Sequence, residues 1–180
     1  DKGIMKFLSK KLTAIGFKCT IIKSKGTGTN PALNLYARYG KSKPHIMYLG
    51  HTDVVANLDN WKLPPFKAVV SKGYLNGRGA QDMKGGIACW ISAVSNFIKN
   101  NKFKGSISII ISADEETTGY GCPAVMKYLR KKGEKIDFSI VGEPSSNKSV
   151  GDEIRIGRRG SMNGVITVYG KSGHSAFYGS

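Results

Sequence analysis

The sequence is poor in cysteine, in acidic residues and in long apolar runs, and each scarcity excludes a class of protein. Its 180 residues include three cysteines, which lie far apart and form no Cys-x-x-Cys pair. Neither a disulfide framework nor a thiolate zinc site is therefore expected, and this usage is typical of a reducing, cytoplasmic setting. No stretch approaches the ~20 apolar residues that a membrane-spanning helix needs. The sequence shows no charged segment followed by an apolar one, the pattern of a signal peptide, so no signal peptide is expected.

Acidic residues are greatly outnumbered, since 28 Lys+Arg against 12 Asp+Glu give a formal net charge of +16. Such an excess is typical of proteins that bind nucleic acid. The lysines are scattered, however, and there is no RNP-like motif, helix-turn-helix signature or zinc-finger spacing. We therefore interpret the excess as a solvated, lysine-rich surface and keep a nucleic-acid-binding module as the least favoured hypothesis. Neither a nucleic acid nor a membrane is expected as a partner.

Apolar periodicity predicts strands that alternate with helices over the first ~145 residues. Helices are predicted over residues 4–15, 83–98 and 123–129, and strands over 17–22, 33–39, 46–49, 106–111 and 136–141. This alternation predicts an α/β fold with a mixed, largely parallel sheet flanked by helices. Two later strand-like segments, 153–156 and 160–169, predict the start of a second, α+β unit.

Half of the scarce carboxylates stand at the ends of apolar segments, where an unpaired carboxylate is costly. They are Asp53, Asp82, Asp114, Glu115, Glu116 and Glu143. The triplet at 114–116 follows a buried strand, and its carboxylates repel one another unless a cation is present. Functional residues gather at the carboxyl ends of strands in such sheets, so these acids are expected to meet one another.

The imidazole of His51, directly after the strand 46–49, completes the donors that a hydrolytic metal site needs. One imidazole and several carboxylates suit one or two divalent ions, with zinc expected and cobalt or manganese as substitutes. Taken singly, His51 could be a surface residue or a satisfied core residue, Asp82 a helix N-cap and Glu143 an ordinary loop residue. Their combination favours the metal site.

Four segments carry a resemblance to a known family: Leu-Gly-His-Thr-Asp-Val-Val at 49–55, Gly-Arg-Gly-Ala-Gln-Asp-Met-Lys-Gly-Gly at 77–86, Asp-Glu-Glu at 114–116 and Val-Gly-Glu-Pro at 141–144. Their order resembles the di-zinc aminoacylase/carboxypeptidase-like metallopeptidases. Residues 151–161 and 170–174 are similar to the members that remove succinate from a diamino acid. The resemblance covers essentially the whole chain but only the N-terminal half of such enzymes. It implies a zinc-exopeptidase-like catalytic domain, incomplete, over 1–156 and the beginning of a lid or dimerisation domain, truncated, over 157–180.

The resemblance also implies the metal ligands. His51 and Glu143 would hold one zinc ion, Glu116 would belong to the second, and Asp82 would bridge both. A cis peptide bond is expected after Asp82. The histidine of the second ion would lie in the half that this chain lacks, so the 180 residues would supply one nearly complete zinc site and one partial site.

Further roles follow from the same resemblance. Asp53 would orient the ring of His51, and Glu115 would be the general base that takes a proton from the attacking water and passes it to the leaving amine. His174 would reach from the lid into the active site of a partner subunit and stabilise the tetrahedral oxyanion. Arg158 and Ser161 would bind substrate carboxylates.

The expected activity is therefore the hydrolysis of N-succinyl-LL-2,6-diaminopimelate to succinate and LL-2,6-diaminopimelate. The intact enzyme is expected to be a cytoplasmic homodimer with two Zn²⁺ per subunit and a small-molecule substrate. A related deacylase, such as an acetylornithine deacetylase or a dipeptidase, stays open. So does a catalytically silent, truncated remnant.

Overall fold

The computed structural model describes residues 3–27, 29–56, 60–157, 160, 162, 164–170 and 173. The chain divides into two compact units, Asp1–Pro144 and Ser145–Ser180. The assignment of a catalytic domain to 1–156 and of a lid domain to 157–180 stays a prediction.

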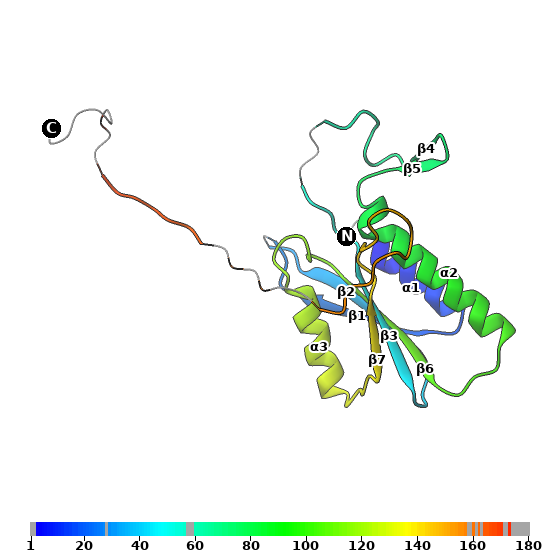
Figure 1. Cartoon of the computed structure of the whole chain (residues 1–180). Coiled ribbons are helices and arrows are strands. Elements are labelled where there is room, and N and C mark those ends of the chain that lie inside the picture. Colours follow the sequence, from blue (N-terminus) through cyan, green and yellow to red (C-terminus); the bar gives the residue numbers. More distant parts are fainter. Residues whose placement is uncertain are drawn as a thin grey trace. The chain divides into compact units, whose positions relative to one another are not determined.

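The first unit is built on a five-stranded mixed sheet with the strand order β1-β2-β6-β3-β7 (Figure 1). Its strands are β1 (Lys18–Ser24), β2 (Ala32–Gly40), β3 (His45–His51), β6 (Ser106–Ser112) and β7 (Phe138–Val141). β2 is antiparallel to both β1 and β6, whereas β6, β3 and β7 run parallel. The carboxyl ends of these three strands therefore meet at one edge of the sheet. The expected mixed sheet is confirmed, with parallel pairing confined to these three strands.

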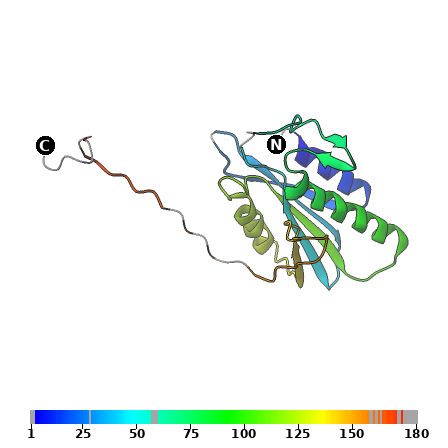
Figure 2. The same ribbon diagram turned by 45° about the horizontal axis from the view of Figure 1, so that its top comes forward.

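Helices cover both faces of this sheet (Figures 1 and 2). α1 (Ile4–Ala14) and α2 (Gly85–Asn100) lie on one face, and α3 (Gly121–Lys131) lies on the other. Successive side chains of a strand point to opposite faces, so Ile109 packs with α1 and α2 while Ile110 packs with α3. Every residue of β6 is buried, as expected of a strand that is covered on both faces. No helix in the described part of the chain is long and apolar enough to cross a membrane.

The first helix follows from its apolar spacing. Met5, Leu8 and Leu12 recur at intervals of three and four residues and are buried, because residues at this spacing share one face of a helix. Gly16 follows the helix with φ 92°, a left-handed conformation that glycine adopts without steric cost. The expected helix over 4–15 is thus confirmed to within one residue.

Two local features differ from the pattern of strands predicted from the sequence. A small hairpin of β4 (Val69–Ser71) and β5 (Tyr74–Asn76) lies where no strand was predicted. Residues 153–156, expected to be a strand, are in no strand, and Ile154 and Ile156 are exposed. Alternating polarity makes a strand only where a neighbouring strand accepts its backbone hydrogen bonds, and no strand among the described residues pairs with this segment.

We expect Ile109→Ala to lower the free energy of unfolding by about 2–5 kcal/mol, because it leaves a cavity in the centre of the sheet. Ile154→Ala is the control, since Ile154 is 83% exposed and its truncation should cost less than about 0.5 kcal/mol. Urea unfolding of both variants measures the difference. Equal stabilities would contradict the burial of β6 between the two helix layers.

Candidate metal centre

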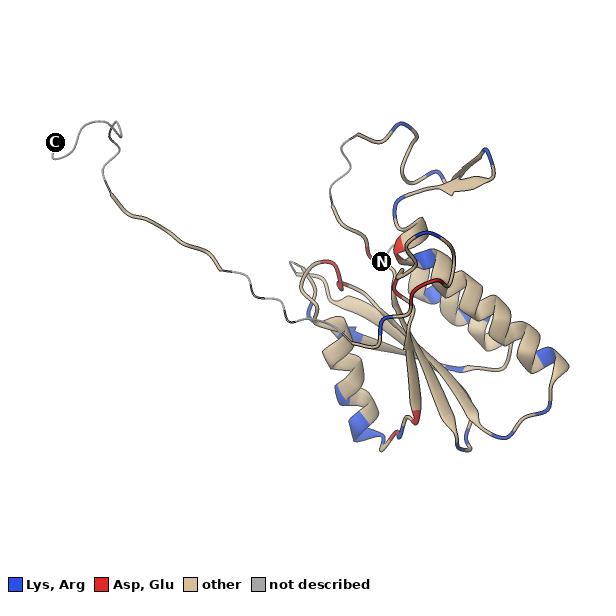
Figure 3. Ribbon diagram, in the orientation of Figure 1, with Lys and Arg blue, Asp and Glu red and all other residues tan. Residues whose placement is uncertain are grey.

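Three neighbouring parallel strands deliver the candidate ligands to one edge of the sheet. His51 is the last residue of β3, Glu115 and Glu116 follow β6, and Glu143 follows β7. Figure 3 shows acidic residues near these strand ends and basic residues spread over helices and loops. The parallel register, in which His51 is paired with Ser112 and Leu49 with Val141, brings these segments level with one another.

Asp82 reaches the same place from the kinked segment η1 (Ala80–Lys84), directly before α2, in which Asp82 and Met83 have non-helical backbone angles. The Asp82–Met83 peptide bond is cis, as the resemblance implies. Met83 is fully buried and anchors this turn in the core. A side chain at Gly50 would stand 3.0 Å from Met83 Cε and from Ile87 Cγ1. The glycine before His51 therefore lets the turn that carries Asp82 pack against β3.

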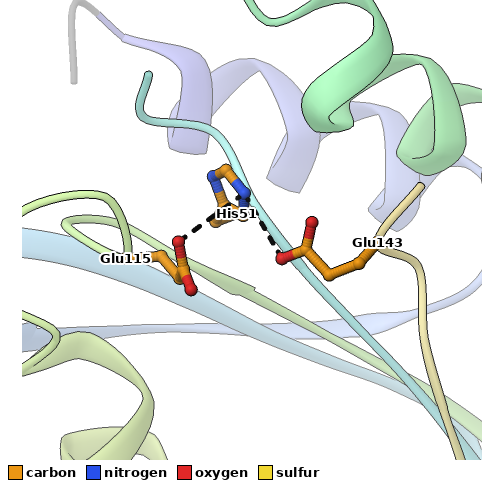
Figure 4. A group of neighbouring side chains, drawn as sticks. All are labelled: His51, Glu115 and Glu143. Carbon is orange, nitrogen blue, oxygen red and sulfur yellow. Dashed lines mark ion pairs between the residues drawn. The ribbon is translucent and has the colours of Figure 1, made fainter. Parts of the chain in front are cut away.

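The imidazole of His51 is the point on which the carboxylates converge. Its Nε2 atom lies 3.1 Å from Asp82 Oδ1, 3.5 Å from Glu143 Oε1 and 4.0 Å from Glu115 Oε2. Figure 4 shows His51 between Glu115 and Glu143, with both carboxylates directed toward the ring. His51 is buried, whereas the three carboxylates are partly open to solvent. The cluster therefore combines a fixed nitrogen with oxygens that a small molecule can reach.

Two overlapping groups of side chains have the geometry to hold a cation. One comprises His51, Glu115 and Glu143, and the other comprises His51, Asp82 and Glu116; within each group, the nearest ligand atoms lie within 4.8 Å of one another. Imidazole nitrogen and carboxylate oxygen are zinc donors, so the residues present fit a divalent ion. The structure thus brings Glu115 next to the expected ligands, and the separate roles of the five residues stay predictions.

Asp53 lies on the other side of the His51 ring. His51 Nδ1 is 3.2 Å from the Asp53 carbonyl oxygen and 3.4 Å from carboxylate Oδ1. The Glu116 backbone N–H donates to Asp53 Oδ2 at 2.9 Å, which fixes the carboxylate. A proton on Nδ1, facing Asp53, leaves the lone pair of Nε2 directed at the acidic cluster. Asp53 is therefore placed to set the tautomer in which His51 can bind a cation.

The electrostatics of the cluster are unfavourable without a cation. Burial works against protonation of His51, but Asp53, Glu143 and Glu115 outweigh it and raise the pKa of the imidazole to about 9. Burial, followed by repulsion from Asp82 and Glu115, raises the pKa of the Glu143 carboxyl, and the same causes raise that of Glu116. A bound divalent ion would compensate the carboxylates and replace the imidazole proton, because metals bind the neutral ring.

Tyr48 borders the site, although its position in the sequence did not indicate this. Burial, then repulsion from Glu143, raises the pKa of its phenol to about 12. A side chain at Gly142 would collide with the Tyr48 hydroxyl, so only glycine lets the chain pass over Tyr48 directly before Glu143. The signal in the sequence was a glycine immediately preceding an isolated acid at a strand end.

Lys84 is a second residue at the site that the sequence did not indicate. Its ammonium Nζ donates to the Thr52 carbonyl at 3.3 Å. This hydrogen bond connects η1 to the residue between His51 and Asp53. Burial lowers the pKa of Lys84, although Asp53 and Asp82 oppose that shift. Its position two residues after Asp82 was visible, but nothing in the sequence indicated where its side chain points.

Asp114 departs from the expectation of three clustered carboxylates. Its φ is 66°, and its side chain accepts hydrogen bonds from the N–H groups of Tyr120 and Gly121 at 3.2 and 2.9 Å. It also accepts one from the Thr118 hydroxyl. Asp114 therefore satisfies free N–H groups at the start of α3, and it belongs to neither cation-binding group.

Three of the expected site residues, His174, Arg158 and Ser161, lie outside the described residues. Their roles in binding substrate carboxylates and stabilising the oxyanion stay predictions.

We expect the zinc affinity of the metal-free chain to rise about a hundredfold from pH 6 to pH 8. The pKa of His51 is about 9, so the ring is protonated throughout this range and each zinc bound there must displace its proton. Competition with a chelator at the two pH values measures the change. A rise of only about fourfold would indicate an ordinary histidine pKa near 6.5 and contradict the acidic surroundings described for His51.

We expect Asp114→Ala to lower the free energy of unfolding by about 1–3 kcal/mol, because it leaves N–H groups at the start of α3 without an acceptor. Zinc stoichiometry should stay unchanged, since Asp114 lies in neither cation-binding group. Thermal unfolding and metal analysis of the same sample check both statements. Loss of a bound ion at unchanged stability would make Asp114 a ligand instead.

The sequence and the fold were compared with known proteins. The profile of peptidase family M20/M25/M40 matches residues 47–174. A curated protein of Pelagibacter ubique (strain HTCC1062), named succinyl-diaminopimelate desuccinylase, is 49% identical over 181 residues, which cover 98% of this chain and 47% of that protein. The chain thus spans about half the length of this relative.

Solved structures show the same fold. Human carnosine dipeptidase 1 matches with a TM-score of 0.65 and 26% identity over 77% of this chain and 32% of its own. An M20 family metallo-carboxypeptidase, Sso-CP2 from Sulfolobus solfataricus, also gives a TM-score of 0.65, with 23% identity over 78% of this chain and 32% of its own. Because the family profile extends from within β3 to residue 174, and so includes every segment that supplies the cluster, the chain belongs to peptidase family M20/M25/M40.

Proposed function

We propose that the protein to which this chain belongs is an amide hydrolase, which converts N-succinyl-LL-2,6-diaminopimelate and water to succinate and LL-2,6-diaminopimelate. The observation that carries the proposal is the convergence of three carboxylates on His51 Nε2 in a member of this peptidase family. The choice of substrate rests on the name of the relative that is 49% identical to the chain. Because that match covers 47% of the relative, the reaction is proposed for the intact protein.

The cluster would hold two divalent ions, with zinc as the first choice and cobalt or manganese as substitutes. His51 and Glu143 would bind one ion, Glu116 the other, and Asp82 would lie between them. The two cation-binding groups support these four residues as ligands, because one contains His51 and Glu143 and the other contains Asp82 and Glu116. The position of Asp82 between the ions rests on the resemblance to the family. When bound, such ions polarise the amide carbonyl and increase the acidity of the attacking water.

Glu115 is proposed as the general base. Its side chain is 42% exposed and ends 4.0 Å from His51 Nε2, so it borders the cluster and stays accessible to water. Its carboxylate would take a proton from the attacking water as the oxygen adds to the amide carbon. It would then return that proton to the nitrogen as the carbon–nitrogen bond breaks, releasing succinate and the free amine. Asp53 would hold the His51 ring in one tautomer throughout.

Substrate binding would involve three residues near the C-terminal end of this chain. His174 would stabilise the oxyanion in the active site of a partner subunit within a homodimer, and Arg158 and Ser161 would bind substrate carboxylates. The formal net charge of +16 supports an anionic substrate, because a cationic surface raises its local concentration. The reducing setting expected from the cysteines supports a cytoplasmic location.

A second candidate is the hydrolysis of a dipeptide, which the structural likeness to human carnosine dipeptidase 1 supports. Assays of the zinc-loaded gene product with N-succinyl-LL-2,6-diaminopimelate, N-acetylornithine and a dipeptide distinguish these reactions. We expect kcat/KM to be highest for the succinylated substrate. A higher value for one of the others would reassign the reaction, and absence of turnover with metal bound would favour a silent remnant.

We expect Glu115→Gln to lower kcat by about 10²- to 10⁴-fold, because the amide cannot accept the proton of the attacking water. Zinc content should stay unchanged if Glu115 is a base, whereas loss of an ion would make it a ligand. Steady-state kinetics and metal analysis measure both quantities. Glu134→Gln is the matched control, since Glu134 pairs with Arg38 away from the cluster and an amide oxygen can still accept from that guanidinium.

A further inference from the structure

A recess of about 320 Å³ opens beside the cation cluster. Asp82 and Glu116, both members of one cation-binding group, form one part of its lining. Trp61 and Arg78 form another part. The recess therefore joins carboxylates that can hold a cation to a guanidinium that has no role in the proposed reaction steps.

The backbone around Arg78 is held by hydrogen bonds on both sides. The Arg78 N–H donates to the Pro65 carbonyl at 2.8 Å, and the Gly79 carbonyl accepts from the Lys84 N–H at 3.0 Å. Gly79 has φ 75°, and a side chain there would collide with Val54, so glycine lets this segment pass close to the wall of the recess. The position from which the Arg78 side chain extends is thus defined by the fold.

The Arg78 side chain lies over an aromatic ring. Its Cζ atom is 5.1 Å from the centroid of the Trp61 ring, a distance at which a cation and a π system attract each other. A guanidinium at an aromatic face still presents N–H groups at its edge, and its five donors allow it to bind a carboxylate alongside other partners. A planar fork held in this way is suited to a carboxylate that enters the recess.

The rest of the lining suits an acyl chain. Val54 and Val55 add apolar surface to the recess. The succinyl group of the proposed substrate has methylene groups between the amide carbonyl and a free carboxylate. The diamino acid half carries a free ammonium group, which the guanidinium of Arg78 would repel. The chemistry of the recess therefore favours the succinyl half.

We propose that Arg78 binds the free carboxylate of the succinyl group while the amide carbonyl lies at the cation cluster. Asp82 and Glu116 on their own would repel an anion, so this binding depends on cations that compensate them. Arg78 would thereby select a succinyl group over an uncharged acyl group, because an acetyl group offers the guanidinium no carboxylate. The inference rests on the proposed function, since it depends on the succinylated substrate.

Two substrates that differ only in the acyl group test this selectivity in the intact, zinc-loaded gene product. For Arg78→Gln we expect the ratio of kcat/KM for N-succinyl- over N-acetyl-LL-2,6-diaminopimelate to fall at least tenfold, mainly through a higher KM for the succinylated substrate. Zinc content should stay unchanged. Arg78→Lys should lie between, because an ammonium group keeps the charge but loses the planar fork.

Arg130→Gln is the matched control, since Arg130 is exposed on α3, and its ratio should stay within twofold of that of the unsubstituted protein. An equal loss of kcat/KM for both substrates in Arg78→Gln would make Arg78 a structural residue and overturn the inference.

Binding of the acyl product supplies a measurement that needs neither turnover nor a variant of Arg78. Succinate and butyrate are similar in length, and only succinate has a second carboxylate. We expect succinate to bind the zinc-loaded gene product at least tenfold more tightly than butyrate and to change its tryptophan fluorescence. The fluorescence change should be absent from Trp61→Phe, since Trp61 lies against Arg78. Equal affinities, or a fluorescence change that persists in Trp61→Phe, would overturn the inference.

Failure of this inference and failure of the proposed function give different results. Tight succinate binding without turnover of the succinylated substrate would contradict the proposed reaction alone. Turnover of that substrate with equal affinities for succinate and butyrate would contradict the role of Arg78 alone. If Arg78→Gln does not fold, the binding measurement on the unsubstituted protein still decides.

Discussion

The site depends on the position of one buried imidazole between two sets of carboxylates. His51 closes the central strand β3, with Asp53 beside Nδ1 and three carboxylates around Nε2. A ring in this position cannot turn without losing contacts on both sides. The sheet supplies this constraint, because β6 and β7 flank β3 in parallel and end at the same edge.

The packing around His51 holds several carboxylates close together, although they repel one another. Met83 holds the turn of Asp82 in the core, and glycines at 50 and 142 allow close approach on either side of β3. Burial, followed by repulsion from neighbouring carboxylates, raises the pKa values of Glu116 and Glu143, so the charged carboxylates are unfavourable here in the absence of a cation. The folded chain therefore favours binding of a divalent ion, since ligand binding recovers part of that cost.

Much of the fold could be predicted from the sequence, because its elements obey simple periodicities. The isoleucines at 109–111 required a strand covered on both faces, and the spacing of Met5, Leu8 and Leu12 required a helix. The segment 153–156 shows the limit of such reasoning, since alternation does not reveal whether a neighbouring strand exists. The hairpin β4–β5 escaped prediction for the opposite reason, because its strands of three residues each are too short to display a period.

The candidate site was predictable to the level of residue types and strand ends. Which of these residues face His51 could not be predicted, because this depends on local dihedral angles and on side-chain direction. Asp114 and Glu115 are neighbours in the sequence, yet the positive φ of Asp114 turns its carboxylate to the start of α3 while Glu115 faces His51. Lys84 was missed because an ordinary lysine gives no signal until its surroundings are known. For Tyr48 the one signal was indirect, since it was Gly142 that indicated a close approach before Glu143.

The concentration of acidic residues at one edge also affects how molecules of this chain behave toward one another. Half of the 12 acidic residues belong to the segments around His51, so six remain elsewhere, whereas nearly all of the 28 lysines and arginines lie outside those segments. Outside that edge the surface is strongly cationic, and copies repel one another over about a Debye length, ~10 Å at 0.1 M salt. Colloidal stability of the dissolved protein is therefore governed by ionic strength.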